Sequence, residues 1–207
     1  MGVRFLVATV AIGCVVAGCS DSNETHVVVL KAVDSYGNLA PGWAVDETWK
    51  SGPIDCSGGA QSPFDVTDGV RFCGTTADDG AACWPKGANQ IYCLADAQKR
   101  TVKLANATGL NKPLQRRTDP PTPAALILHD GTVCRTRTGG TWPSRPDGTS
   151  PTHKCSTQPG KFMAVWATSG APDGIHKSSD GWTVDVGSDS GPLTRHTVST
   201  AYFVGMG

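Results

Sequence analysis

The fold is decided by the stretch Ala124-Ala-Leu-Ile-Leu-His-Asp-Gly-Thr-Val-Cys-Arg-Thr-Arg137. Two short runs rich in β-forming residues flank the dipeptide Asp130-Gly131. Asp-Gly favours the positive φ angles of a two-residue type I′ turn. The stretch therefore predicts an antiparallel hairpin of residues 124–129 and 132–137.

Similar short runs recur along the chain, with turn signals between them. Residues 90–95 and 100–105 predict a second hairpin. In residues 182–187, apolar and polar side chains alternate, as in a strand with one buried and one solvent-exposed face. No amphipathic helical stretch with capping signals follows residue 20. We therefore expect an all-β or mainly β domain, either a barrel or a sandwich; a propeller ranks last because no long repeat is visible.

The cysteines are the second constraint on the fold. Two of the eight lie in the first twenty residues, and an even number in the rest of an exported chain indicates disulfides. Sequence alone allows many pairings, but proximity favours local closure. No C-x-x-C pair is present and an oxidising compartment disfavours thiolate ligands, so no metal site is expected. Three disulfides use all six of these cysteines, so no catalytic thiol is expected either. The preferred bridges are Cys56–Cys73, Cys83–Cys93 and Cys134–Cys155.

The first twenty residues have the parts of a secretory signal. Arg4 precedes an apolar run from Phe5 to Val16, and the small residues Ala17 and Gly18 follow. The apolar run is too short for a membrane-spanning helix, which needs about 20 residues. The leader therefore directs the chain out of the cytoplasm.

Val16-Ala17-Gly18-Cys19 resembles a lipobox, the lipidation signal of bacterial lipoprotein precursors. The resemblance implies a diacylglycerol thioether on Cys19, with acyl chains such as palmitate, and cleavage before that residue. The chain then divides into a signal peptide (1–18), a lipidated tether (19–26) and an extracytoplasmic β-rich domain (27–207) on the cell membrane. An ordinary secretory leader is the alternative. Beyond the leader, the chain resembles uncharacterised exported proteins of actinobacteria, which implies no activity.

The charge balance argues against nucleic acid as a partner, because the formal net charge is +0. The distribution is uneven, with an acidic excess in residues 19–96 and a basic excess in residues 97–145. Either these two excesses face each other in the fold, or the second forms a basic face toward anionic lipid or wall polymer.

Two tryptophans, Trp84 and Trp142, each precede a proline and are expected in loops. Aromatic faces stack on sugar rings, and arginines reach anionic groups. Trp84, Trp142, Arg135, Arg137 and Arg145 are therefore a candidate binding surface for a glycan or polymer. The alternative is that these tryptophans only cover the end of a barrel.

Catalytic signals are weak. Asp189-Ser190-Gly191-Pro192 resembles the nucleophile stretch of chymotrypsin-like proteases, and His129 with Asp130, or His153, would supply the base. However, the second glycine of that family is missing, and too few residues follow Ser190. The histidines are scattered, without the spacing of a metal site. No catalytic residue, metal or cofactor is predicted.

These observations favour a non-enzymatic, lipid-anchored envelope protein that binds a wall component or a protein partner. A hydrolase acting on wall material or peptide is the second hypothesis. An inhibitor of wall-degrading enzymes is the third.

Overall fold

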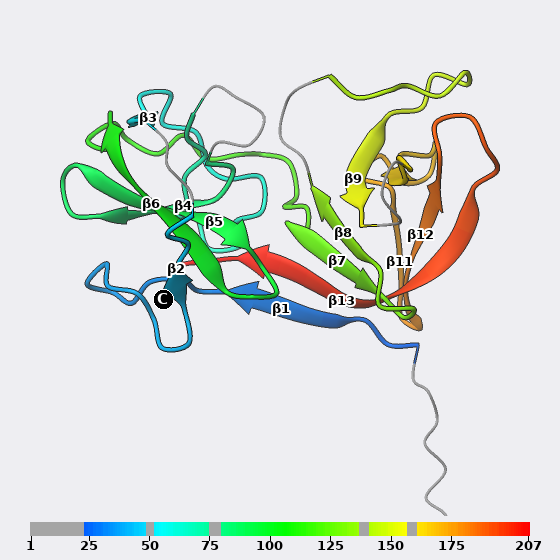
Figure 1. Cartoon of the computed structure of the whole chain (residues 1–207), viewed down its shortest axis with the longest axis horizontal. Coiled ribbons are helices and arrows are strands. Elements are labelled where there is room, and N and C mark those ends of the chain that lie inside the picture. Colours follow the sequence, from blue (N-terminus) through cyan, green and yellow to red (C-terminus); the bar gives the residue numbers. More distant parts are fainter. Residues whose placement is uncertain (1–22, 49–51, 75–79, 137–140, 157–160) are drawn as a thin grey trace, which may run out of the picture.

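The computed structural model describes residues 23–48, 52–74, 80–136, 141–156 and 161–207. These residues form thirteen strands in two sheets that lie side by side, and none of them is helical (Figure 1). Within the described residues there is accordingly no helix long and apolar enough to cross a membrane. The expectation of a mainly β fold is confirmed.

Six antiparallel strands close into a barrel. Of the two expected architectures, barrel and sandwich, the structure has the barrel. Each strand pairs with the next, and the last pairs with both β12 and β7 to complete the ring. The order around the barrel is β7 (Ala125–Leu128), β8 (Val133–Thr136), β9 (Pro151–Cys155), β10 (Ala164–Trp166), β12 (Gly181–Gly187) and β13 (Thr194–Val204).

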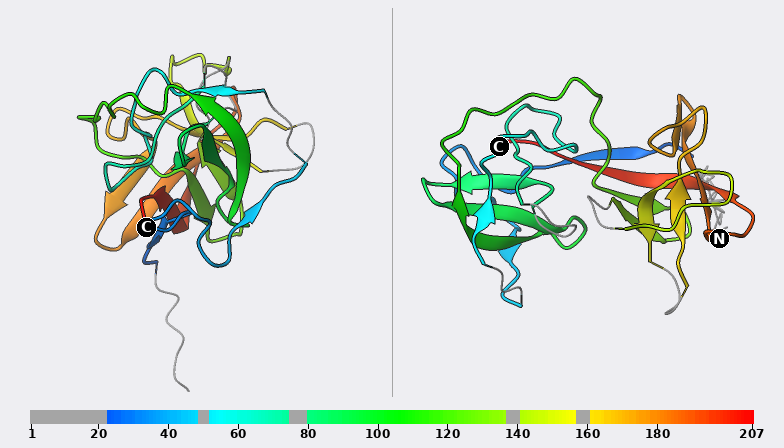
Figure 2. Two further views of the ribbon diagram at one scale, coloured as in Figure 1. Left: turned by 90° about the vertical axis from the view of Figure 1, so that its left-hand side faces the viewer. Right: turned by 90° about the horizontal axis from the view of Figure 1, so that it is seen from above.

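Two further strands extend the barrel sheet. β1 (His26–Leu30) runs parallel to the last residues of β13, and β11 (Ile175–Ser178) pairs with the start of β12. β1 and β13 run together from the barrel to the second sheet (Figure 2). The barrel interior is filled by aliphatic side chains such as Leu126, Val184 and Val198.

The second sheet, called here the small sheet, is open. Its central strands are the expected second hairpin, and β2 and β3 run parallel to β6. Its strands are β2 (Ala44–Val45), β3 (Ile54–Asp55), β4 (Cys83–Lys86), β5 (Gln90–Asp96) and β6 (Thr101–Thr108).

The small sheet has two different faces. One face, with Trp84 and Val102, packs against Leu30 of β1 and Val204 of β13, which joins the small sheet to the barrel. The other face covers a core made largely of alanine and half-cystine side chains. The small sheet therefore shares one core with the barrel and has one thin core of its own.

All three expected disulfides are confirmed: Cys56–Cys73, Cys83–Cys93 and Cys134–Cys155. The second and third join directly opposite residues of adjacent antiparallel strands, β4 with β5 and β8 with β9. The first closes a loop at the outer core of the small sheet.

The first hairpin is confirmed as β7–β8, but its turn is not the expected type I′. Only Gly131 has a positive φ, of 82°, and Asp130 does not. The amide of Gly131 donates to the Leu128 carbonyl, and the amide of Leu128 donates to the Thr132 carbonyl. The loop therefore has three residues, a type I turn followed by a left-handed glycine. The Asp130 carboxylate accepts the Thr132 amide and supports this arrangement.

The fold begins before the expected boundary at residue 27. The Thr25 side chain already forms hydrogen bonds to the barrel, and β1 starts at His26.

Candidate ligand pocket

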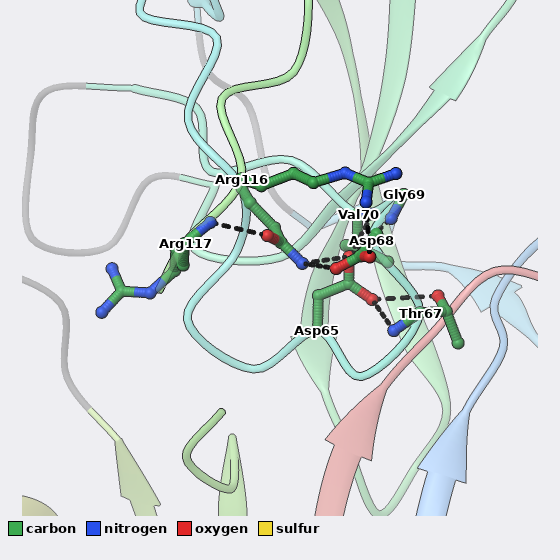
Figure 3. Close-up of polar contacts among 8 residues, drawn as sticks. Asp65, Thr67, Asp68, Gly69, Val70, Arg116 and Arg117 are labelled. Atoms are coloured by element: carbon green, nitrogen blue, oxygen red, sulfur yellow. Dashed lines mark hydrogen bonds and ion pairs between the residues drawn. The ribbon is translucent and has the colours of Figure 1, made fainter. Parts of the chain in front are cut away.

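A polar pocket of about 190 Å³ lies in the small-sheet region, beside the end of β13. It forms where the turn of residues 61–70 meets the segment of residues 115–121 (Figure 3). The turn is fixed to β13, because the Val66 amide donates to the Val204 carbonyl. The lining residues are Gln61, Ser62, Pro63, Asp65, Val66, Asp68, Arg117, Asp119 and Pro121.

Asp65 organises the turn that forms the pocket. Its Oδ1 accepts hydrogen bonds from the amide and hydroxyl of Thr67, at 2.8 and 3.0 Å. Its Oδ2 accepts the amides of Gly69 and Val70, at 2.7 and 2.8 Å. The side chain thus satisfies backbone donors that this irregular loop cannot pair in a sheet. Because Asp65 is buried and fully engaged, it is a structural residue of the pocket floor.

Gln61 joins the two walls of the pocket. Its buried amide nitrogen donates to Asp65 Oδ2 at 3.3 Å and to Asp68 Oδ1 at 3.0 Å. Its side-chain oxygen accepts the backbone amide of Arg117 at 2.9 Å. The floor is therefore set by hydrogen bonds before any ligand arrives, so a ligand would meet a preformed surface.

The rim carries charges of both signs. Arg116 Nη1 lies 3.3 Å from Asp68 Oδ2, and Arg117 Nη2 lies 3.2 Å from Asp119 Oδ2. All four side chains are exposed to solvent to a large extent, so these pairs are weak and can exchange partners. Pro63, Pro121 and Val66 add apolar surface between the charges. The pocket suits a small polar group that carries charge.

The candidate binding surface of two tryptophans and three arginines does not form, and the expectation for Trp84 is wrong. Trp84 is fully buried, and its indole nitrogen donates to the Gly205 carbonyl at 2.9 Å. Pro85 lies in the edge strand β4 and not in a loop, so Trp84 points into the core. Arg135 forms an ion pair with Asp96 of the small sheet, at 2.6 Å.

Trp142 and Arg145 instead cover one end of the barrel, as in the alternative interpretation. Arg145 donates to the carbonyls of Ser188 and Gly191, at 2.6 and 2.8 Å, and its guanidinium lies 5.4 Å from the Trp166 ring centroid. The ring centroids of Trp142 and Phe162 lie 5.9 Å apart, with the two rings perpendicular. Arg137 lies outside the described residues. The other four members of the set are thus divided among three places.

The protease-like residues are not brought together. The Ser190 hydroxyl donates to Asp189 at 3.2 Å, and His129 lies in the exposed β7–β8 loop. His153 is buried inside the barrel, with its Nε2 3.2 Å from the Pro123 carbonyl oxygen. Because a carbonyl only accepts, Nε2 carries the proton. Burial lowers the pKa of His153 to about 4. This histidine is a neutral structural side chain.

Part of the acidic and basic excess is paired within the fold. Arg116 with Asp68, and Arg135 with Asp96, join the basic segment to the acidic one. Among the described residues, no group of three or more histidine, cysteine, aspartate or glutamate side chains is placed to hold a metal ion.

The protein is thus a disulfide-bonded β-barrel with an attached small sheet. Compared with models of protein families, curated protein sequences and solved structures, the chain matches none. The sequence does not single out the pocket residues, although Asp65 in a segment rich in glycine and aspartate is typical of a side-chain-capped turn. The contact between Gln61 and Arg117 spans 56 positions and leaves no local signal.

Proposed function

We propose that the protein is a lipid-anchored accessory protein on the extracytoplasmic face of the cell membrane, and that it binds rather than transforms its ligand. The leader and Cys19 support the anchor, as set out above. Three disulfides support an oxidising compartment, because cytosolic thiols are kept reduced.

The observation that carries the binding role is the preformed pocket with its mixed-charge rim. A volume of about 190 Å³ is below that of sites for drug-sized ligands, so it suits one charged group of a larger partner. Arg117 would face an anionic group, and Asp68 and Asp119 a cationic one. An amino-acid-sized unit with both charges, in a wall peptide or at a protein terminus, has this chemistry.

A hydrolase is the weaker alternative. A serine hydrolase needs a base beside its nucleophile, and the Ser190 hydroxyl is engaged with a carboxylate. None of the residues that line the pocket is a histidine, cysteine or lysine.

The test is retention of envelope material by the native acylated protein in detergent. Arg117→Gln should abolish retention of a ligand with an anionic group, as measured by mass spectrometry of the eluate. Lys154→Gln removes one exposed positive charge from the barrel and is the matched control. Equal retention by both variants would exclude the pocket as the binding site. Mass spectrometry of Cys19 in material from the native host tests the anchor independently.

A further inference from the structure

The N-terminal segment is fixed to one end of the barrel before it enters β1. The Thr25 hydroxyl donates to the Val198 carbonyl and accepts the Trp182 amide, each at 2.8 Å. Val198 and Trp182 are direct neighbours across β12 and β13. Thr25 therefore attaches the segment to the wall of the closed barrel.

Asn23 lies against the same end of the barrel. Gly181, at the start of β12, has a φ of +121°, and a Cβ atom there would collide with the carbonyl group of Asn23. Only glycine leaves room for this close approach of two backbones. The docked segment therefore includes Asn23 as well as Thr25.

This end of the barrel, called here the entry pole, presents a polar surface. It contains the β11–β12 turn, with Ser179 and Asp180, and the β7–β8 loop, with His129 and Asp130; all four residues are exposed. In Figure 1 both connections lie where the chain enters the barrel. At the other end of β12, the segment around Arg145 covers the barrel through Ser188 and Gly191.

We propose that the entry pole faces the lipid surface and touches its headgroups. This placement rests on the proposed lipid anchor. After cleavage before Cys19, four Cα–Cα steps separate Cys19 from Asn23, which reach at most about 14 Å. β12 alone rises roughly 20 Å. While Asn23 stays docked, the anchor therefore keeps the entry pole within about 14 Å of the bilayer, and the barrel cannot stand upright with its opposite end on the lipid.

The partner of this surface is the headgroup layer and not the hydrocarbon core. The exposed residues named above are polar. Asp180 brings negative charge, and Asp130 lies 3.3 Å from His196 Nδ1. The exposed Lys177 beside Trp182 pairs with Asp173, so these groups carry no excess positive charge that would attract the pole to anionic lipid. The acyl chains supply the binding energy, and the short tether sets the orientation. Vesicle binding should therefore change little with salt.

The experiment compares two labelled positions in the acylated protein. Ser179→Cys marks the entry pole and Ser144→Cys marks the opposite end; both positions are exposed. Each variant carries a fluorophore and is bound to vesicles of phosphatidylethanolamine and phosphatidylglycerol with a headgroup-linked quencher. We expect strong quenching at residue 179 and little at residue 144. Equal quenching, or stronger quenching at residue 144, overturns the placement.

Two substitutions that release the segment sharpen this test. Thr25→Val removes the hydroxyl bridge, and Gly181→Ala displaces Asn23, so each should lengthen the tether and remove most of the difference between the labels. Thr136→Val removes another barrel hydroxyl, which donates to the Pro123 carbonyl, and is the matched control. This control should keep the difference in quenching between residues 179 and 144. If Thr25→Val and Gly181→Ala both keep the full difference as well, docking of the N-terminal segment is not its cause.

The same experiment gives a different result if the proposed anchor, and not the placement, is wrong. If Cys19 is not acylated, neither labelled protein binds vesicles, and the anchor and the placement are both refuted. If the protein binds through Cys19 but the labels are quenched equally, only the placement is refuted.

Discussion

The barrel and the small sheet solve the same stability problem by different means. The barrel closes its ring of strands with hydrogen bonds and contains one disulfide. The small sheet is open, two of its strands have only two residues, and its outer core contains two disulfides. Where strands close on themselves, few covalent bonds are needed.

The two cores explain the difference. The barrel buries leucine, isoleucine and valine side chains, which contribute about 1.5–3 kcal/mol each. The outer core of the small sheet is mainly alanine and half-cystine, which remove little apolar surface from water. Cross-links that restrict the unfolded chain compensate for the missing burial. Disulfides are thus concentrated where the core is thin.

The largest effect is expected from the bridges of the small sheet. Replacing Cys56, Cys73, Cys83 and Cys93 with alanine should lower the free energy of unfolding by about 6 kcal/mol, at about 3 kcal/mol per bridge. The amide protons of β5 and β6 should then exchange much faster, while those of β12 and β13 stay protected. Hydrogen exchange measures this directly.

The control is the barrel bridge. Replacing Cys134 and Cys155 with alanine should cost about 3 kcal/mol and leave the barrel strands protected below the melting temperature. Equal loss of protection in both regions would mean that the two sheets unfold as one unit, and the comparison would fail.

Acid should affect the barrel first, through His153. Burial lowers its pKa to about 4, against an ordinary value of 6.5, so in this window the unfolded chain binds a proton that the folded barrel does not. The free energy of unfolding should therefore fall as the pH drops from 6.5 toward 4, by up to about 3 kcal/mol. His153→Gln keeps a donor to Pro123 and should flatten this dependence in urea titrations. As a control, substitution of the exposed His129 by glutamine should leave this pH dependence unchanged.

Two buried tryptophans offer a matched pair across the regions. Trp84 donates to the Gly205 carbonyl and Trp166 to the Gly187 carbonyl, each at 2.9 Å, and both are fully buried. Each Trp→Phe substitution should cost about 2 kcal/mol, from a lost hydrogen bond and a void. Only Trp84→Phe should speed amide exchange at residues 202–204, because Gly205 directly follows β13. The reverse pattern would show that Trp84 does not join the two sheets.

The smallest effect is expected at the ion pair between the regions. Burial raises the pKa of Asp96, but hydrogen bonds from the Lys99 amide and from Arg135 outweigh it, and the pKa lies below its ordinary value. Arg135→Gln should therefore cost up to about 1 kcal/mol at neutral pH, and this loss should vanish as the pH falls through the pKa of Asp96. Arg116→Gln, which breaks a more exposed pair, should have almost no effect on stability. If both substitutions lower the free energy of unfolding equally, the ion pair between Arg135 and Asp96 stabilises the fold no more than an exposed pair does.

Local features of the fold were predictable from the sequence. Both hairpins were found because their strands are joined by short connections with turn residues. The disulfide pairings followed from proximity, and two of the three bridges join paired strands within or next to those hairpins. In each case the decisive contacts lie between residues that are close in the chain.

Long-range features were not predictable. The dipeptide Trp84-Pro85 suggests a loop, but it lies in the edge strand β4. No local sequence feature shows that the Gly205 carbonyl accepts the hydrogen bond of the Trp84 indole. The pocket requires two segments to meet through Gln61 and Arg117. Barrel closure depends on the pairing of β12 and β13 with the rest of the ring, which period-two patterns do not specify.

The parallel pairing of β1 with β13 has a consequence for the order of events in folding. Residues 26–30 find their partners only at residues 200–204, so this pair cannot form until the chain has been made as far as residue 204. Contacts of such high sequence separation form slowly. β1 therefore stays without its partner while the local hairpins of β5 with β6 and of β7 with β8 can already form. Oxidation of the local cysteine pairs would then precede the pairing of β1 with β13.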